Sequence, residues 1–262
     1  MRRDNVLKFL ASDYGDKRQF DQMSMRSLMI ETSLSIKKEA KILDLACGDG
    51  RLLIPLAKMY PKAYFWAYDV SPEMLDQLKI QLMAQKIKNV TIIEGDFNAD
   101  NWCDAFGQNL FDVVILFQAI HFVKNVDRFL SELKQLLVQG GKLIIASTSH
   151  EQFHHLPYCR LFETVLKREL ARTPDKVDLI SRLVGMGLKI VNSIDIEIVR
   201  SFMDEVDLRK WLSLRPFSVM AYLTKKQMDK GIDNSVDFWK KTKEYVVDEF
   251  SVMTFENSAK RL

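Results

Sequence analysis

The chain has 262 residues, enough for one large domain or two small ones, and 47% hydrophobic with 28% charged residues is a composition that can bury a core. Its 38 Lys and Arg residues barely outnumber its 35 Asp and Glu residues and are scattered, so we expect no nucleic-acid partner. Three cysteines without C-x-x-C spacing give no disulfide framework or metal cluster, and no apolar run reaches about 18 residues, so we expect a cytoplasmic protein without a membrane span.

Residues 1–39 carry apolar patches separated by a polar stretch around Gly15, which predicts two short helices. Because these helices precede the first expected strand, they are placed to cover a ligand crevice, and Tyr14 is a candidate for substrate contact. The alternative is that their apolar residues simply pack onto a sheet.

The stretch from Lys41 to Ile54 organises the rest of the chain. Its first half is a short apolar run ending in an acid, typical of a buried parallel strand. Gly48 and Gly50 then bracket a tight turn whose backbone can approach a ligand closely, and a helix follows with its free N–H groups at the same edge. Strand, glycine turn and helix together predict a nucleotide-type binding corner.

The spacing of the turn decides which nucleotide is expected. A dinucleotide site would need a third glycine where Leu53 stands, and no P-loop pattern occurs in the chain. The run from Asp44 to Gly50 closely resembles the first motif of class I S-adenosylmethionine-dependent methyltransferases. That motif usually has a glycine where this chain has Ala46, which leaves slightly less room under the ligand.

Residues 64–68 form a second expected strand, and Asp69 ends it 19 residues after the second glycine of the turn. An acid at about this distance can accept hydrogen bonds from two ribose hydroxyls, although a helix-capping or surface acid is the alternative. Ser71 is a helix N-cap candidate. Met74, in the first turn of that helix, is expected either along the ligand or in the core.

A third expected strand, 90–94, ends in Gly95-Asp96-Phe97. This phrase resembles the adenine site of the same family, in which the acid accepts from the exocyclic amine and the apolar neighbour lines the ring. A carboxylate supplies acceptor atoms and a phenyl face supplies dispersion. Turn chemistry alone is the alternative explanation.

The fourth expected strand, 111–117, is apolar after Asp112 and therefore central. Relatives that methylate nucleobase amines carry an Asn-Pro-Pro-aromatic motif after this strand, and its absence here favours a small-molecule acceptor. His121 is the best-placed general base because the histidine side chain ordinarily titrates near neutral pH, and a hydrogen-bonded structural histidine is the alternative.

An amphipathic pattern predicts a helix over 126–137 that stops at Gly140-Gly141, followed by a fifth strand over 142–147. The join between them is similar to the one in class I methyltransferases. Strands thus alternate with helices, which predicts an α/β fold with a Rossmann-like, doubly wound, mostly parallel sheet.

His150 to His154 match the H-E-x-x-H pattern of zinc metalloproteases. That site needs a continuous helix and a third ligand, whereas Pro157 follows closely, so we expect no metal. We instead expect a loop or short helix over the crevice, where His150 and His154 are candidates to meet a polar or anionic substrate, with solvent exposure as the alternative.

The remaining pattern predicts a helix from Thr173 to about Gly187, a strand over 188–199, helical structure over 203–243 and a last strand over 250–255. The family closes its sheet with an antiparallel last strand in this order. The helical stretch would then be a cap insertion over the substrate, in which Arg215 is a further candidate contact.

The resemblance covers residues 40–147 and implies one methyltransferase domain over 1–262. Its expected parts are N-terminal helices 1–39, a cofactor-binding core 40–149, helical cap segments 150–172 and 203–243, and remaining core elements 173–202 and 244–262. The implied cofactor is S-adenosyl-L-methionine. The residues expected to bind it are Asp44, Ala46, Cys47, Gly48, Asp69, Val70, Met74, Gly95, Asp96, Phe97, Phe117 and Gln118.

The implied activity is methyl transfer to the oxygen or nitrogen of a small molecule, such as a carboxylate or hydroxyl, by in-line displacement. Alignment of the reacting atoms can supply on the order of 7 to 11 kcal/mol, and a base such as His121 is needed only if the acceptor is protonated. The alternatives are a noncatalytic S-adenosylmethionine or nucleotide sensor, a partner-binding module and, disfavoured by Leu53, an NAD-dependent oxidoreductase. The pattern gives no oligomeric state.

Overall fold

The computed structural model describes residues 37–258, so the predicted N-terminal helices and Tyr14 lie outside the described residues. Within this range the chain forms two compact units. The core unit contains residues 37–147, 176–194 and 251–258, and the cap unit contains residues 148–175 and 195–250. No helix within the described ranges is both long and apolar enough to cross a membrane.

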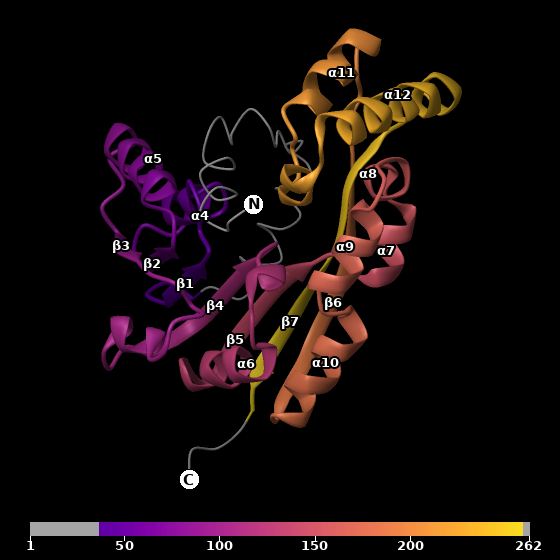
Figure 1. Ribbon diagram of the computed structural model, residues 1–262. Helices are drawn as coiled ribbons and strands as arrows, with labels where there is room; N and C mark the ends of the chain where they lie inside the picture. The colour runs from indigo at the N-terminus through magenta and orange to yellow at the C-terminus, as the bar shows by residue number, and fades with distance from the viewer. Residues whose placement is uncertain (1–36, 259–262) are drawn as a thin grey trace. The chain divides into compact units, whose positions relative to one another are not determined.

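Seven strands form one sheet in the order β3-β2-β1-β4-β5-β7-β6 (Figure 1). The strands are β1 Lys41–Leu45, β2 Tyr64–Asp69, β3 Val90–Glu94, β4 Phe111–Phe117, β5 Leu137–Ser147, β6 Leu188–Val199 and β7 Val246–Asn257. Strands β1 to β5 pair in parallel, whereas β7 pairs antiparallel with β5. This arrangement confirms the predicted fold class.

Helices of the core unit connect these strands. They are α4 Leu53–Met59, α5 Pro72–Ala84, η1 Trp102–Phe106, η2 Ile120–Phe122, α6 Val126–Gln135 and α10 Lys176–Gly185. Helix α5 begins as predicted: the Ser71 side chain accepts a hydrogen bond from the Met74 N–H, and Pro72 occupies the first turn. The end of β2 and the start of α5 are thereby fixed next to each other.

One face of the sheet carries a row of apolar side chains in register. Leu43, Val114, Leu143 and Phe255 lie side by side on β1, β4, β5 and β7, and all four are buried. They belong to the hydrophobic cluster that also includes Phe129, Leu130 and Leu133 of α6 and Leu179 and Leu183 of α10. Ile115 of β4 and Ile144 of β5, on the opposite face, are buried as well, so both faces of the central strands are covered and these strands read as nearly continuous apolar runs.

The predicted boundary at Gly140-Gly141 is wrong. Helix α6 ends at Gln135, and β5 begins at Leu137, so both glycines lie inside the strand. The pairing of β5 with β4 shifts register between Phe111 and Val113, and a Cβ on Gly141 would lie 3.0 Å from the Phe111 carbonyl oxygen. Gly141 therefore permits a close strand approach at a bulge, and Gly140 supplies a left-handed backbone conformation (φ 72°), so the pair does not terminate the helix.

The cap unit contains six helical elements. They are α7 His150–His155, α8 Pro157–Leu161, α9 Val165–Arg172, α11 Glu205–Ser213, η3 Ser218–Tyr222 and α12 Lys225–Thr242. The helical pattern predicted over 203–243 is thus divided into three, with α8 packing on α9 and α12. A buried Glu169 pairs with Arg172, whose Nη2 also donates to Ser218 Oγ at 2.9 Å, so α9 is held against η3.

Candidate cofactor site at the carboxyl ends of the strands

Asp44 lies on the central strand β1, next to β2 and β4, with only 3% of its surface exposed. Burial, and secondarily the negative charge of Asp69, raise the pKa of the Asp44 carboxyl to about 8. Among residues 37–258, no hydrogen bond stabilises this carboxylate. Within this range no basic side chain contributes to lowering its pKa, so the end of β1 holds a buried acid whose charge the described residues do not balance.

The glycine turn follows β1 and contains three left-handed backbone conformations, at Ala46 (φ 56°), Gly48 (57°) and Gly50 (83°). A Cβ on Gly50 would overlap the terminal methyl group of Leu78 in α5, and the left-handed φ would strain any larger residue, so both features favour glycine here. A Cβ on Gly48 would meet no described atom within 4 Å. Gly48 thus leaves open space beside the turn, which suits close approach of a ligand.

Asp69 joins the loops that follow β1 and β2. Its Oδ2 accepts a hydrogen bond from the Gly48 N–H at 2.8 Å, and its Oδ1 accepts one from the Ser71 N–H at 2.9 Å. Burial raises the pKa of this carboxyl, and the backbone donors lower it in part. Because a carboxylate has about four acceptor sites, Asp69 retains capacity for hydroxyl donors.

The loop after β3 lies beside Asp69, since the Gly95 N–H donates to the Asp69 carbonyl at 2.9 Å. A Cβ on Gly95 would overlap the Tyr68 ring, which explains the glycine. Asp96 Oδ1 accepts from the Asn98 backbone and side chain at 2.9 and 3.0 Å. Phe97 is 6% exposed and packs on Phe129, so much of its ring serves the core, and its contact with adenine stays a prediction.

Asn98 is a site residue that the sequence reasoning missed. Its Nδ2 donates to the Phe122 carbonyl at 3.2 Å, and its Oδ1 accepts from the Lys124 N–H at 2.7 Å. The loop after β3 is therefore tied to the segment that carries His121. The available signal was an asparagine two residues after an aspartate, a spacing typical of side-chain-closed turns.

Gln118 directly follows β4 in a left-handed conformation (φ 50°), which is uncommon for a residue other than glycine. Its N–H donates to the Ala146 carbonyl at 2.8 Å, and its side-chain Nε2 is buried without a hydrogen-bond partner among the described residues. His121 lies on η2, three residues further along, with its ring 4.1 Å from that of Phe122. The predicted base function of His121 is not tested by this geometry.

The acids predicted from the sequence thus lie at one edge of the core unit. Asp44 and Asp69 interact through their charges, and the Gly95–Asp69 backbone hydrogen bond places Asp96 next to this pair. Strands β1, β2 and β3 are neighbours, so their carboxyl ends meet at the same edge.

The predicted substrate residues of the cap unit have different surroundings. His150 Nε2 lies 2.8 Å from the Thr173 carbonyl, to which it donates, whereas His154 is exposed. Arg215 Nη1 donates to the carbonyls of Met220 and Leu223 at 2.7 and 2.9 Å, which closes η3. Within residues 37–258 no three His, Cys, Asp or Glu side chains are arranged to hold a metal ion.

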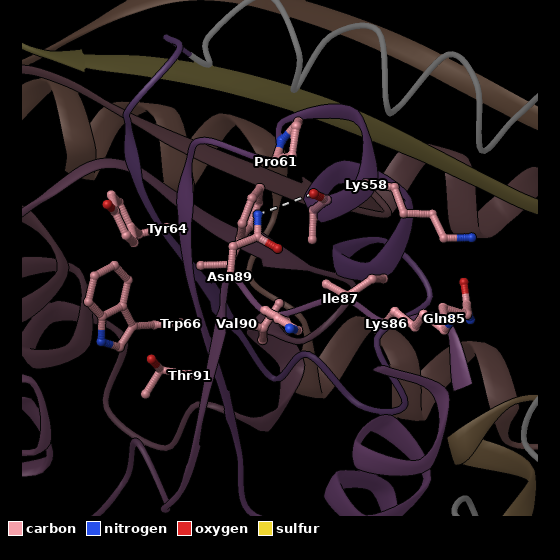
Figure 2. A pocket seen from close by; sticks show the side chains of 13 residues that line it. Lys58, Pro61, Tyr64, Trp66, Gln85, Lys86, Ile87, Asn89, Val90 and Thr91 are labelled. Atoms are coloured by element: carbon pink, nitrogen blue, oxygen red, sulfur yellow. Dashed lines mark hydrogen bonds between the residues drawn. The ribbon is translucent and has the colours of Figure 1, made fainter. Parts of the chain in front are cut away.

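A cavity of about 510 Å³ lies at the opposite edge of the sheet (Figure 2). Its lining includes Tyr64 and Val90, which begin β2 and β3, and three lysines, Lys58, Lys86 and Lys88. Figure 2 shows Asn89 at its centre, and the Asn89 side chain donates to the Ala57 carbonyl at 3.2 Å. This cavity is therefore separate from the edge that carries Asp44, Asp69 and Asp96.

A doubly wound sheet with a glycine turn and buried acids at its carboxyl edge defines a nucleotide-binding α/β protein. A family model described as a methyltransferase domain matches residues 36–181. The chain belongs to this family and is a class I S-adenosylmethionine-dependent methyltransferase.

Part of the chain is similar in sequence to two curated relatives. A malonyl-[acyl-carrier protein] O-methyltransferase of Bacillus cereus is 29% identical over 140 residues, covering 51% of this chain and 49% of that protein. A (S)-tetrahydroprotoberberine N-methyltransferase of Eschscholzia californica is 24% identical over 123 residues, covering 46% and 33%. The match thus spans about half or less of either relative's length.

The fold is also found in a solved structure. An S-adenosylmethionine-dependent methyltransferase from Aquifex aeolicus matches with a TM-score of 0.56 at 16% identity, covering 97% of this chain and 99% of that one. At this identity the likeness concerns the fold.

Proposed function

We propose that this methyltransferase methylates an oxygen or nitrogen of a small-molecule acceptor. The names of the two curated relatives support both atoms, because one describes an O-methyltransferase and the other an N-methyltransferase. The absence of an Asn-Pro-Pro-aromatic motif after β4 supports an acceptor other than a nucleobase amine. Turnover measurements with carboxylic acids, phenols and amines distinguish an oxygen acceptor from a nitrogen acceptor.

The observation that carries the cofactor part of the proposal is the buried carboxyl of Asp44, which lies beside Asp69 and receives no hydrogen bond from residues 37–258. Two acids in one hollow disfavour further negative charge and favour a cationic ligand. S-adenosylmethionine bears a sulfonium and an ammonium group, so these two carboxyl groups fit it. The open side of Gly48 supports the same assignment.

Each residue of this edge has a proposed part in binding. Asp69 accepts from the ribose hydroxyls while it keeps the glycine turn in place through Gly48. Asp96 accepts from the adenine amine, and Asn98 fixes the loop that carries it. The other residues that we assign to cofactor binding, through backbone or apolar contacts, are Ala46, Cys47, Val70, Met74, Gly95, Phe97, Phe117 and Gln118.

Bound S-adenosylmethionine supplies an activated methyl group on a positively charged sulfur. The chain itself then has to bind the acceptor in line, exclude water and remove a proton where the acceptor carries one. His121 is proposed as that base for a hydroxyl or amine acceptor. A carboxylate acceptor is already ionised and needs no base.

Calorimetric titration of the whole chain with S-adenosylmethionine, its demethylated product and NAD tests the cofactor part. We expect the first two to bind and NAD not to bind. Release of the demethylated product, measured with panels of carboxylic acids, phenols and amines, tests catalysis. Binding without turnover in every panel would contradict the proposed oxygen or nitrogen acceptor, whereas binding of NAD alone would contradict the cofactor assignment.

A further inference from the structure

Arg200 directly follows strand β6 and belongs to the cap unit. Its backbone N–H donates to the Tyr245 carbonyl at 3.1 Å, which fixes the start of the side chain. The guanidinium carbon lies 5.1 Å from the ring centre of Phe202 and 5.4 Å from that of Trp211. Two aromatic rings therefore hold the cation in a defined place.

The two rings are themselves held by their neighbours. Phe202 and Trp211 lie 5.4 Å apart, and both contact the fully buried Tyr245 ring edge to face. Trp211 also contacts Phe217. Because these aromatic side chains come from separate segments of the cap unit and pack on one another, the Arg200 guanidinium is pre-organised.

The Arg200 guanidinium has no hydrogen-bond or ion-pair partner among residues 37–258, and its Nη1 is buried. Burial lowers the pKa of Arg200, and the Asp207 charge opposes this effect without forming an ion pair. Other arginines of the same unit are satisfied: Arg172 pairs with Glu169, and Arg209 pairs with Glu205 and Asp233. An unpaired, part-buried cation is costly, so its retention calls for a partner.

The N–H groups of the Arg200 guanidinium indicate which chemical group would bind to it. A guanidinium whose faces contact rings keeps its in-plane N–H groups for an acceptor, and these match the two oxygens of a carboxylate. One cation with Asp207 nearby favours a single negative charge. A phosphate dianion would carry uncompensated charge and be repelled by that acid.

We propose that Arg200 recognises a carboxylate group of the methyl acceptor, so that the substrate class is a carboxylic acid. This inference rests on the proposed small-molecule methyltransferase function. It assigns Arg200 to substrate recognition in the cap unit and gives it no part in binding the cofactor.

The test uses the whole chain saturated with S-adenosylhomocysteine and titrates it with the monocarboxylates butyrate, hexanoate, phenylacetate and benzoate, each paired with its uncharged primary amide. Calorimetry and tryptophan fluorescence are the readouts, since Trp211 contacts the guanidinium. We expect at least one acid to bind tenfold or more tightly than its amide. Arg200→Gln should abolish this preference, and Arg200→Lys should restore it only in part.

Arg168→Gln is the matched control, because Arg168 also lies over a ring, that of Tyr222 at 5.6 Å, but is exposed. This variant should keep the carboxylate preference. The proposal is overturned if the wild-type chain shows no preference for any acid, or if Arg200→Gln leaves the preference intact, whatever its effect on thermal stability. S-adenosylhomocysteine affinity, measured first for each variant, separates this failure from failure of the proposed function.

Discussion

At the scale of single residues, the site is shaped by acids whose charge is incompletely balanced. Asp44 and Asp69 are both buried at neighbouring strand ends, and the pKa of each is raised by burial. Only Asp69 receives backbone hydrogen bonds in compensation. The two acids are therefore expected to respond differently to ligand, to pH and to substitution.

Asp44 should couple cofactor binding to proton release. With a pKa of about 8 the carboxyl is mostly protonated at pH 6 to 7, and a cationic ligand favours its ionised form. S-adenosylmethionine affinity should therefore rise between pH 6 and 8 and level off above that. Calorimetry in buffers of different ionisation enthalpy measures the released proton directly.

Asp44→Asn is the control, because it removes this titration and keeps that of the ligand itself. It should bind S-adenosylmethionine more weakly and release fewer protons. The same raised pKa predicts that Asp44 stabilises the ligand-free fold most below about pH 4 and that this contribution is lost as pH rises through 8. An identical pH dependence in wild type and variant would show that Asp44 is not the coupled group.

Asp69→Asn should affect both ligand and fold. The Asn amide cannot accept at both positions that now receive the Gly48 and Ser71 N–H groups. We expect at least tenfold weaker S-adenosylhomocysteine binding by calorimetry and a loss of about 1 to 3 kcal/mol of unfolding free energy in urea.

Asp76→Asn, an exposed change on the neighbouring helix α5, is the comparison for Asp69 and should leave both quantities unchanged. Affinity of Asp69→Asn within twofold of wild type would remove the ribose assignment. The sequence alone predicts only the weaker ligand binding of Asp69→Asn. The cost in stability follows from hydrogen bonds that become visible once the glycine turn is placed beside Asp69.

At the scale of elements, prediction succeeded where one local signal decided the outcome. Strands β4 and β6 have the predicted bounds because each is a long apolar or alternating run, and α5 starts at a Ser-Pro pair. Prediction failed where contact with another segment of the chain determines the local structure. A Gly-Gly pair can end a helix or form a β-bulge. Only the close approach of Gly141 to Phe111 on β4 shows that the pair forms a bulge here.

The division of residues 203–243 has a similar explanation. Arg215 has a left-handed φ of 52° and precedes Pro216, which disfavours helical backbone before it, so α11 ends and η3 begins as a separate element. Arg200 was missed altogether. Its surroundings are assembled from Phe202, Trp211 and Tyr245, which no spacing in the sequence brings together.

Packing between α12 and the segment after α8 gives a prediction about Gly231→Ala. In an exposed helix this change gains about 1 kcal/mol, but here the new Cβ would overlap the Phe162 ring, which is only 1% exposed. We expect a net loss of about 1 to 3 kcal/mol of unfolding free energy. Gly185→Ala in α10, where no described atom lies within 4 Å of the Cβ, is the matched control and should not destabilise. Equal effects would show that the Phe162 ring has room to move.

At the scale of the whole molecule, ligand binding should protect one sheet edge selectively. Hydrogen exchange with and without S-adenosylhomocysteine should slow in residues 44–50, 69–74 and 95–98, which carry the glycine turn and the loops after β2 and β3. Residues 85–91, beside the cavity at the opposite edge (Figure 2), should exchange unchanged. Protection confined to 85–91 would relocate the cofactor site.

Strand β7 lies between β5 and β6 in the sheet although it is made after both. While the ribosome is still adding residues 200–245, β5 has emerged with its apolar row but without the neighbour that will cover its free edge. Phe250, Val252, Met253 and Phe255 must then insert as a strand between two elements that already exist. Nascent chains of this protein should accordingly need chaperone protection until the codons for β7 have been translated and that strand has left the exit tunnel.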